Sequence, residues 1–229
     1  MAYTNLFFDL DRTLWDFEAN AIEAFQDIFV DYSLQRYFPG VESFVQTYEK
    51  YNEELWDQYR KGLIKKDFLR NYRFKLTLMD YGVDDDVLAR KISDRYLEVA
   101  PQKSNLVPGT QEVISHLSGK YRLYILTNGF SEVQGVKMKS TGLDRHFKYM
   151  FTSDEAGYQK PNPKIFEYAL KNLNAKKVES IMIGDDLEVD VLGAKHFGMD
   201  QVFFNPKKVN HREELTYEIN CLKELLSIF

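Results

Sequence analysis

The chain has 229 residues, 44% of them apolar, and a net charge of −5, so it is long enough for one large domain or two modest ones. No basic run suggests a surface for polymeric nucleic acid, and no apolar run reaches the ~18 residues that a membrane helix needs. Its one cysteine, Cys221, excludes an internal disulfide, and its apolar surroundings predict a buried packing residue. No signal peptide is visible at the N-terminus, so we expect a cytoplasmic protein.

The first predicted element is a buried strand near Asn5–Leu10. Asp9 and Asp11 follow the apolar run Leu6-Phe7-Phe8 at its end. Burying a carboxylate without a partner is costly, so both acids should lie at the carboxyl edge of a sheet, where ligands bind in open parallel sheets. A metal ion is the partner that this pair of acids suggests.

Residues 15–106 have helical periodicity. Apolar side chains recur at helical spacing over residues 22–32, 44–59, 68–79 and 87–96. Turn-forming residues separate these stripes at Pro39-Gly40, Gly62 and Gly82. Four amphipathic helices of this length predict a four-helix bundle.

From about Leu106 onward, predicted strands and helices alternate. The strands are expected at Arg122–Thr127, Tyr149–Thr152, Ser180–Gly184 and Gln201–Phe204, and the helices at Thr110–Leu117, Glu132–Thr141, Pro163–Leu173 and Val189–Phe197. This alternation predicts βαβ units and a parallel sheet, with which the N-terminal strand must pair. We therefore predict an α/β protein whose core is formed by residues 1–14 and 107–229, with residues 15–106 inserted as a helical domain.

Polar groups follow each predicted strand of the core. Beyond Asp9 and Asp11, they are Thr127-Asn128-Gly129, Lys160 in the segment Gly157–Pro161, and Asp185 and Asp186 with Asp190 four residues further on. In a parallel sheet all of these groups share one edge. Clustered carboxylates suit Mg²⁺, and a hydroxyl, backbone amides and a lysine beside that ion suit a phosphate.

At four motifs, in order, the chain resembles the haloacid dehalogenase superfamily. The motifs are Asp9-Leu10-Asp11-Arg12-Thr13, Thr127-Asn128-Gly129, Lys160-Pro161, and Gly184-Asp185-Asp186 through Asp190. The resemblance covers most of the chain, including a helical insertion after the first motif. It implies a Rossmann-like parallel-sheet core with an inserted α-helical cap.

The resemblance also implies catalytic roles. Asp9 would be the nucleophile that takes the phosphoryl group, and Asp11 would protonate the leaving oxygen and then deprotonate water. Thr127 and the amide of Asn128 would hold the phosphoryl oxygens. Lys160 would neutralise charge on Asp9 and on the transition state.

A magnesium site is implied by the same motifs. Its ligands would be Asp9, the backbone carbonyl of Asp11, and Asp185. Asp190 would orient Lys160 or a metal-bound water from outside the ligands. Asp186 departs from the family pattern, since many relatives carry a small residue there, and its role is open.

Within the superfamily, the chain looks like the bacterial pyrimidine 5′-nucleotidase branch. The similar segments are Phe7–Asp11, Trp15-Asp16, Leu126–Phe130 and Gly157–Pro161. This resemblance implies a small phosphate ester as substrate, a nucleoside monophosphate in particular. Three aromatic residues border the motifs and are candidates for substrate contact: Trp15, Phe17 and Phe130.

Other functions stay open at this point. A phosphatase of sugar phosphates or phosphoglycolate and a β-phosphoglucomutase-like mutase keep both acids. A 2-haloacid dehalogenase on the same fold needs no second acid, so Asp11 argues against it. A receiver domain is about half as long and has no helical insertion. The sequence leaves the physiological substrate and the oligomeric state undetermined.

Overall fold

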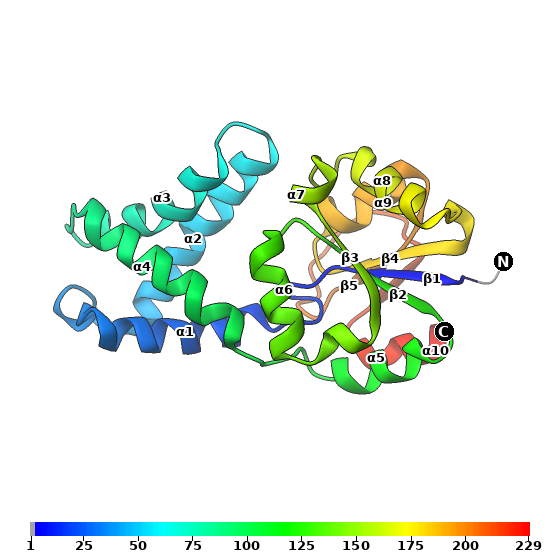
Figure 1. Cartoon of the computed structure of the whole chain (residues 1–229), viewed down its shortest axis with the longest axis horizontal. Helices are drawn as coiled ribbons and strands as arrows, with labels where there is room; N and C mark the ends of the chain where they lie inside the picture. The colour runs from blue at the N-terminus through cyan, green and yellow to red at the C-terminus, as the bar shows by residue number, and fades with distance from the viewer. Residues whose placement is uncertain (1–2) are drawn as a thin grey trace. The chain divides into compact units, whose positions relative to one another are not determined.

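A parallel β-sheet organises one of the two units into which the chain divides (Figure 1). The computed structural model describes residues 3–229, and the sheet belongs to the unit that joins the residues up to Phe17 with Ser104–Phe229. In the described residues its six strands are β1 (Asn5–Phe8), β2 (Arg122–Thr127), β3 (Phe147–Thr152), β4 (Ser180–Gly184), β5 (Asp200–Phe204) and β6 (Tyr217–Ile219). All are parallel, in the order β3-β2-β1-β4-β5-β6, which confirms the predicted fold class.

Helices cover both faces of this sheet. They are α5 (Thr110–Ser118), α6 (Ser131–Ser140), α7 (Ser153–Ala156), α8 (Pro163–Leu173), α9 (Gly193–Phe197) and α10 (Leu225–Ile228). Figure 1 shows α8 and α9 on one side and α5 and α10 on the other. Successive strand residues point to opposite faces, so Leu6 and Phe8 pack with α5, α6 and α10, while Phe7 packs with α8 and α9. Burial from both sides explains why β1 carries a continuous apolar run.

The strand order reverses between β1 and β4. The chain builds β2 and β3 outward on one side of β1, and then β4, β5 and β6 outward on the other. Phe8 pairs with Ile183, and the backbone amide of Asp9 donates to the carbonyl of Ile183 at 2.9 Å. In such sheets ligands bind outside the carboxyl ends of the strands at this reversal.

The second unit, Glu18–Lys103, is helical. Its helices are α1 (Phe17–Asp31), α2 (Val41–Arg60), α3 (Lys66–Met79) and α4 (Asp86–Val99). Aromatic rings fill its interior, with Phe25 stacked on Tyr96 at 4.8 Å between centroids and edge-on to Tyr48 at the same distance. An inserted helical bundle is therefore present, as predicted. The catalytic role of residues 1–14 and 107–229 and the cap role of residues 15–106 stay predictions.

The segment after β4 differs from the continuous helix expected at Val189–Phe197. A π-helix covers Leu187–Leu192 and is followed by α9. The backbone amides of Asp190 and Val191 both donate to the carbonyl of Asp186, at 3.0 and 3.2 Å. The extra residue in this turn widens the helix just after the carboxyl end of β4. Short π-helical segments of this kind are frequent at functional sites.

The prediction that Cys221 is buried was wrong. Its side chain is exposed, and its backbone amide donates to the Glu224 carboxylate at 2.8 Å. Cys221 caps the start of a short helix instead of packing, while Leu222 and Leu225 supply the buried face.

Short helical turns complete the described chain: η1 (Leu34–Arg36), η2 (Ala100–Gln102), η3 (Leu143–Arg145), η4 (Lys177–Glu179) and η6 (Leu222–Glu224). Among residues 3–229, no helix has both the length and the apolar character needed to cross a lipid bilayer.

Candidate active site

Four loops at the carboxyl edge of the sheet carry the residues singled out by the motifs. Asp9 directly follows β1, Thr127 ends β2 and Asp185 directly follows β4. Lys160 lies between α7 and α8, in the connection that follows β3. The parallel sheet thus brings together side chains that are up to 176 positions apart in the sequence.

A tight turn after β1 separates Asp9 from the residues that follow it. Arg12 takes a φ of 63°, a left-handed conformation that few residues other than glycine adopt. The amides of Leu14 and Trp15 both donate to the carbonyl of Leu10 at 2.9 Å, which closes the turn. The buried hydroxyl of Thr13 donates to Asp185 Oδ1 at 2.9 Å, so this turn also holds the acid that follows β4.

Lys160 is buried at the centre of the site, with 1% of its side chain exposed. Its ammonium nitrogen lies 2.6 Å from Asp9 Oδ1, 2.7 Å from Asp190 Oδ1 and 2.6 Å from the carbonyl of Leu126. The ammonium donates hydrogen bonds to Asp9 Oδ1 and to the Leu126 carbonyl, and it forms an ion pair with Asp190 Oδ1. Burial alone would lower the pKa of Lys160, but the charges of Asp190 and Asp9 outweigh it and raise that pKa.

Three acids cluster around this lysine. One carboxylate oxygen from each of Asp9, Asp185 and Asp190 lies within 4.8 Å of the others. Burial raises the pKa of Asp9 well above its usual range, and the opposing effect of Lys160 is smaller. Burial, with the nearby charge of Asp190, also raises the pKa of Asp185 to about 7. The pKa of Asp190 is raised chiefly by burial.

The donor set fits a hard divalent cation. When all three acids are ionised, three carboxylates and one ammonium leave two negative charges in excess, which a divalent cation would neutralise. Mg²⁺ prefers a few carboxylate oxygens and keeps several waters. Asp9 and Asp185, both predicted as ligands, belong to the cluster; Asp190 belongs to it as well, while also contacting Lys160.

The end of β2 presents a hydroxyl and an amide side chain. The Thr127 Oγ1 atom accepts from the amide of Gly129 at 3.0 Å and from Gln134 Nε2 at 2.9 Å. The Asn128 side chain accepts from the amide of Lys160 at 2.8 Å and donates to its carbonyl at 2.9 Å. Asn128 therefore fixes the loop that carries Lys160, a contact that the motif alone does not predict.

The Asp11 carboxylate contacts α6 and does not belong to the acid cluster of Asp9, Asp185 and Asp190. Lys137 Nζ lies 2.5 Å from Asp11 Oδ1, and Gln134 Nε2 donates to Asp11 Oδ2 at 2.8 Å. Neither partner was predicted from the sequence. Only the positions of Gln134 and Lys137 in the sequence could have indicated this role. They lie three residues apart, and so on one face of a predicted helix that begins just after Thr127-Asn128-Gly129.

Asp186, whose role was open, caps the π-helix. Its Oδ1 atom accepts from the amides of Glu188 and Val189, each at 3.0 Å. Its own amide donates to Asp190 Oδ2 at 3.3 Å. Gly184 lies against the same side chain, since a Cβ there would come within 2.3 Å of Asp190 Oδ2. The loop after β4 is thus built to hold Asp190 against Lys160.

The three candidate substrate-contacting aromatics differ in exposure. Trp15 is 1% exposed and belongs to the core packed against β1, and Phe130 is 4% exposed. Phe17 is half-buried, with the Arg12 guanidinium 4.4 Å from its ring centroid. The Lys137 ammonium lies 4.1 Å from the centroid of the Trp15 ring. Little of the Trp15 or Phe130 ring is open to a ligand in this structure, and their contact with substrate stays a prediction.

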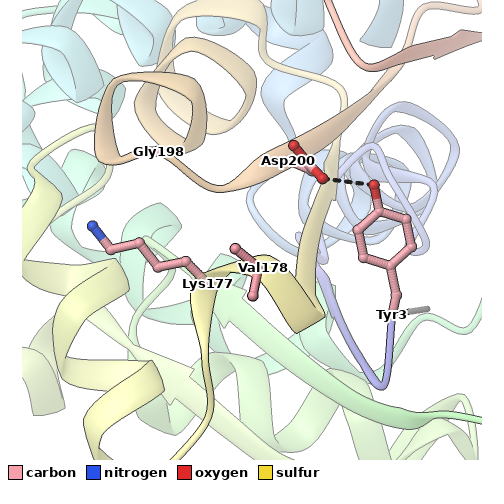
Figure 2. Close-up of a pocket in the computed structure, with 5 residues that line it drawn as sticks. All are labelled: Tyr3, Lys177, Val178, Gly198 and Asp200. Carbon is pink, nitrogen blue, oxygen red and sulfur yellow. Dashed lines mark hydrogen bonds between the residues drawn. The ribbon is translucent and has the colours of Figure 1, made fainter. Parts of the chain in front are cut away.

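A separate cavity lies at the opposite, amino edge of the sheet. Figure 2 shows its lining residues, Tyr3, Lys177, Val178, Gly198 and Asp200, with the Tyr3 hydroxyl donating to Asp200 Oδ2 at 2.7 Å. None of the motif residues lines it. We therefore locate the candidate active site at the carboxyl edge.

Residues 3–198 match the sequence model of the haloacid dehalogenase-like hydrolases. The HAD-hydrolase YfnB of Bacillus subtilis is 33% identical over 230 residues, which cover 99% of this chain and 95% of YfnB. A crystal structure of YfnB, described as bound to magnesium and revealing interdomain movement, superposes with a TM-score of 0.90 and covers 100% of this chain and 99% of that one at 30% identity.

Two further relatives have named substrates. The pyrimidine 5′-nucleotidase YjjG of Escherichia coli is 31% identical, with 98% of this chain and 97% of YjjG covered. A glyceraldehyde 3-phosphate phosphatase of Methanothermobacter thermautotrophicus is 30% identical, with 87% of this chain and 84% of that protein covered.

Proposed function

Because the chain belongs to the haloacid dehalogenase-like hydrolases, we propose that it is a Mg²⁺-dependent phosphatase with Asp9 as its nucleophile. One observation carries this proposal. The Asp9 carboxylate is held at 2.6 Å by a buried lysine and lies in a cluster with two further acids. Such a site fixes a carboxylate for attack and supplies positive charge where a phosphoryl group would bind.

The chain's own residues account for both halves of the reaction. An Asp9 oxygen forms a bond to phosphorus while the bond from phosphorus to the ester oxygen breaks. The ester oxygen leaves with the electron pair of that bond and takes a proton from Asp11. A water then attacks the phosphorus and gives its proton to Asp11, which releases Asp9 as a carboxylate together with inorganic phosphate. Thr127 and the Asn128 amide hold the phosphoryl oxygens, and Lys160 balances the charge that develops on them.

Asp9, the Asp11 carbonyl and Asp185 would hold the magnesium ion, with Asp190 fixing Lys160 beside them. When bound, Mg²⁺ neutralises charge on the phosphoryl group and offsets its repulsion of Asp9.

The proposed substrates are pyrimidine nucleoside 5′-monophosphates. The support is the full-length similarity to YjjG together with the local motif segments that the chain shares with the nucleotidase branch. The alternative is a phosphatase of sugar phosphates, which the relative from Methanothermobacter favours at nearly the same identity. We assign the chemistry to the sheet unit and substrate choice to the helical unit, Glu18–Lys103, as a cap.

The proposal is tested by phosphate release from p-nitrophenyl phosphate and dTMP, with Mg²⁺ and with excess EDTA. We expect turnover only with Mg²⁺, because without it no divalent cation offsets the repulsion between the Asp9 carboxylate and the phosphate dianion. Full activity in EDTA would contradict the metal-dependent mechanism.

Asp9→Asn should reduce turnover of both esters to background, because an amide cannot take the phosphoryl group. Asp144→Asn changes an exposed aspartate in the same unit and is the matched control. Circular dichroism should show both variants folded. Substantial activity in Asp9→Asn would exclude the covalent route.

A further inference from the structure

A chain of contacts links Asp11 to the end of β2 through α6. The Gln134 amide nitrogen donates both to Asp11 Oδ2 at 2.8 Å and to Thr127 Oγ1 at 2.9 Å. Lys137 pairs with the other Asp11 oxygen at 2.5 Å and lies over the Trp15 ring. Both oxygens of the Asp11 carboxylate are therefore fixed from one helix face.

These contacts are protected from water. Gln134 is fully buried, the side chain of Lys137 is 8% exposed and that of Asp11 is 26% exposed. At low exposure an ion pair is screened little by salt, and its geometry is held tightly.

The side-chain amide of Gln134 keeps its orientation although its oxygen accepts no hydrogen bond. Its Oε1 atom is buried and has no hydrogen-bond partner among residues 3–229. Turning the amide over would satisfy neither acceptor and would place Oε1 against the Asp11 carboxylate. A buried acceptor without a partner is costly, so the two donated bonds decide the orientation.

Gly129 leaves the space in which Gln134 lies. A Cβ at position 129 would come within 2.2 Å of Gln134 Nε2. The backbone at the end of β2 is therefore shaped to let the Gln134 side chain cross to Asp11.

We propose that Gln134 and Lys137 are positioning residues that hold Asp11 beside Thr127 for proton transfer to the leaving oxygen. This inference rests on the proposed phosphatase function. Gln134 sets the distance between Asp11 and the phosphate-binding hydroxyl, since one nitrogen bonds to both. Lys137, itself held by Trp15, fixes the second oxygen. Trp15 is thereby assigned to the support of Asp11 through Lys137.

The test compares two leaving groups. We expect Lys137→Met and Gln134→Leu to lower kcat/KM by roughly 10–10²-fold for the best alkyl ester among dTMP, UMP and ribose 5-phosphate, since a misplaced acid loses alignment. For p-nitrophenyl phosphate the loss should be below about threefold, because p-nitrophenolate leaves without a proton. Lys137→Arg should restore most of the alkyl activity, and the exposed neighbour Lys139→Met is the matched control.

A double-mutant cycle separates positioning from general packing. In the Asp11→Asn background, Lys137→Met should change alkyl-ester kcat/KM by no more than about twofold, because its effect passes through Asp11. Equal losses for both leaving groups, or effects that multiply in the cycle, would overturn the inference and leave the phosphatase function intact. A wild-type chain that hydrolyses neither ester class with Mg²⁺ would overturn the proposed function and this inference with it.

Discussion

Lys160 holds two carboxylates that would otherwise repel each other. Its ammonium forms ion pairs with Asp9 and Asp190, both of which are buried, and it also donates to the backbone carbonyl of Leu126. Removing one member of a buried charged group leaves the others uncompensated. Lys160 therefore compensates the charge of the acid cluster inside the fold and, in the proposed mechanism, aligns the nucleophile Asp9.

Lys160→Ala should lower kcat by roughly 10²–10³-fold, the usual effect of deleting one preorganised electrostatic group. Steady-state turnover of p-nitrophenyl phosphate with saturating Mg²⁺ measures it. Lys164→Ala removes an exposed lysine from the same region and should retain activity. A loss below about tenfold in Lys160→Ala would show that this ammonium does not stabilise the transition state.

The pKa of Asp185, raised from 3.8 to about 7, predicts how pH and metal interact. The metal-free folded chain holds a proton on this group more tightly than the unfolded chain does. Its contribution to stability is therefore present at low pH and is lost as pH rises from about 4 to 7. In the proposed site a divalent ion would replace that proton, so Mg²⁺ should stabilise the fold most above neutral pH.

The measurement is the rise in Tm caused by Mg²⁺ at about pH 8 and about pH 5. We expect a larger rise at the higher pH, and a smaller rise at that pH for Asp185→Asn. A rise that is equal at both values, or larger in acid, would contradict competition between metal and proton at this cluster.

At the scale of elements, the sequence predicts the bounds of strands and helices best where the hydrophobic pattern and the turn-forming residues agree. The strands Arg122–Thr127 and Ser180–Gly184 and the helix Pro163–Leu173 have the predicted bounds, because apolar runs and a cap with proline mark their ends. β6 was missed because Tyr217–Ile219 is short, largely exposed and without an apolar run. The π-helix was missed because its extra residue per turn leaves no periodic signal.

The sequence predicted which residues form the site, but it did not predict the hydrogen bonds and ion pairs between them. Strand ends specify that Asp9, Thr127 and Asp185 meet, because parallel strands share an edge. The partner of Asp11 depends on the rotation of α6 about its axis and on a turn at Arg12, which local sequence does not determine. Asp186 as a helix cap likewise follows only once the π-helix is known.

Gly129→Ala tests how the end of β2 and α6 fit together. The added Cβ would overlap the Gln134 side chain, which is flexible enough to move aside without unfolding the helix. We expect the variant to stay folded and to lose alkyl-ester kcat/KM as Gln134→Leu does, roughly 10–10²-fold. Combining the two changes should add little further loss, since both break the same bridge.

Normal activity in Gly129→Ala would show that Gln134 can reach Asp11 by another path. Gly135→Ala is the control for added bulk on α6, because a Cβ there meets no atom within 4 Å. Thermal denaturation of both variants separates a loss of function from a loss of fold.

At the scale of the molecule, one unit holds every motif residue. Asp9, Asp11, Thr127, Lys160 and Asp185 all belong to the sheet unit. Many aromatic rings of the helical unit pack against one another in its interior, where they stabilise the fold of that unit. Function lies in sites placed on a fold and does not follow from the fold, so the assignment of chemistry to the sheet unit and of substrate choice to the helical unit stays a prediction.

The substrate prediction belongs to this scale. We expect kcat/KM for UMP and dTMP to exceed that for ribose 5-phosphate, which offers a phosphate on a sugar without a base. Stacking a base on an aromatic ring contributes about 1–3 kcal/mol, which is roughly one to two decades in binding. The same energy is too unspecific to separate one pyrimidine from another, so modest differences are expected among them.

The measurement is kcat/KM over UMP, dTMP, ribose 5-phosphate, glyceraldehyde 3-phosphate and phosphoglycolate at one Mg²⁺ concentration. Alanine substitutions at Trp15 and Phe130 are poor probes of stacking, since both rings are buried and their loss would disturb packing. Base-free esters are the cleaner control, because they leave the chain unchanged. If a base-free ester is preferred by about tenfold or more, a base contributes no net binding of the size that stacking gives. The nucleotidase assignment would then be wrong, and the sugar-phosphate alternative would take its place on the same catalytic residues.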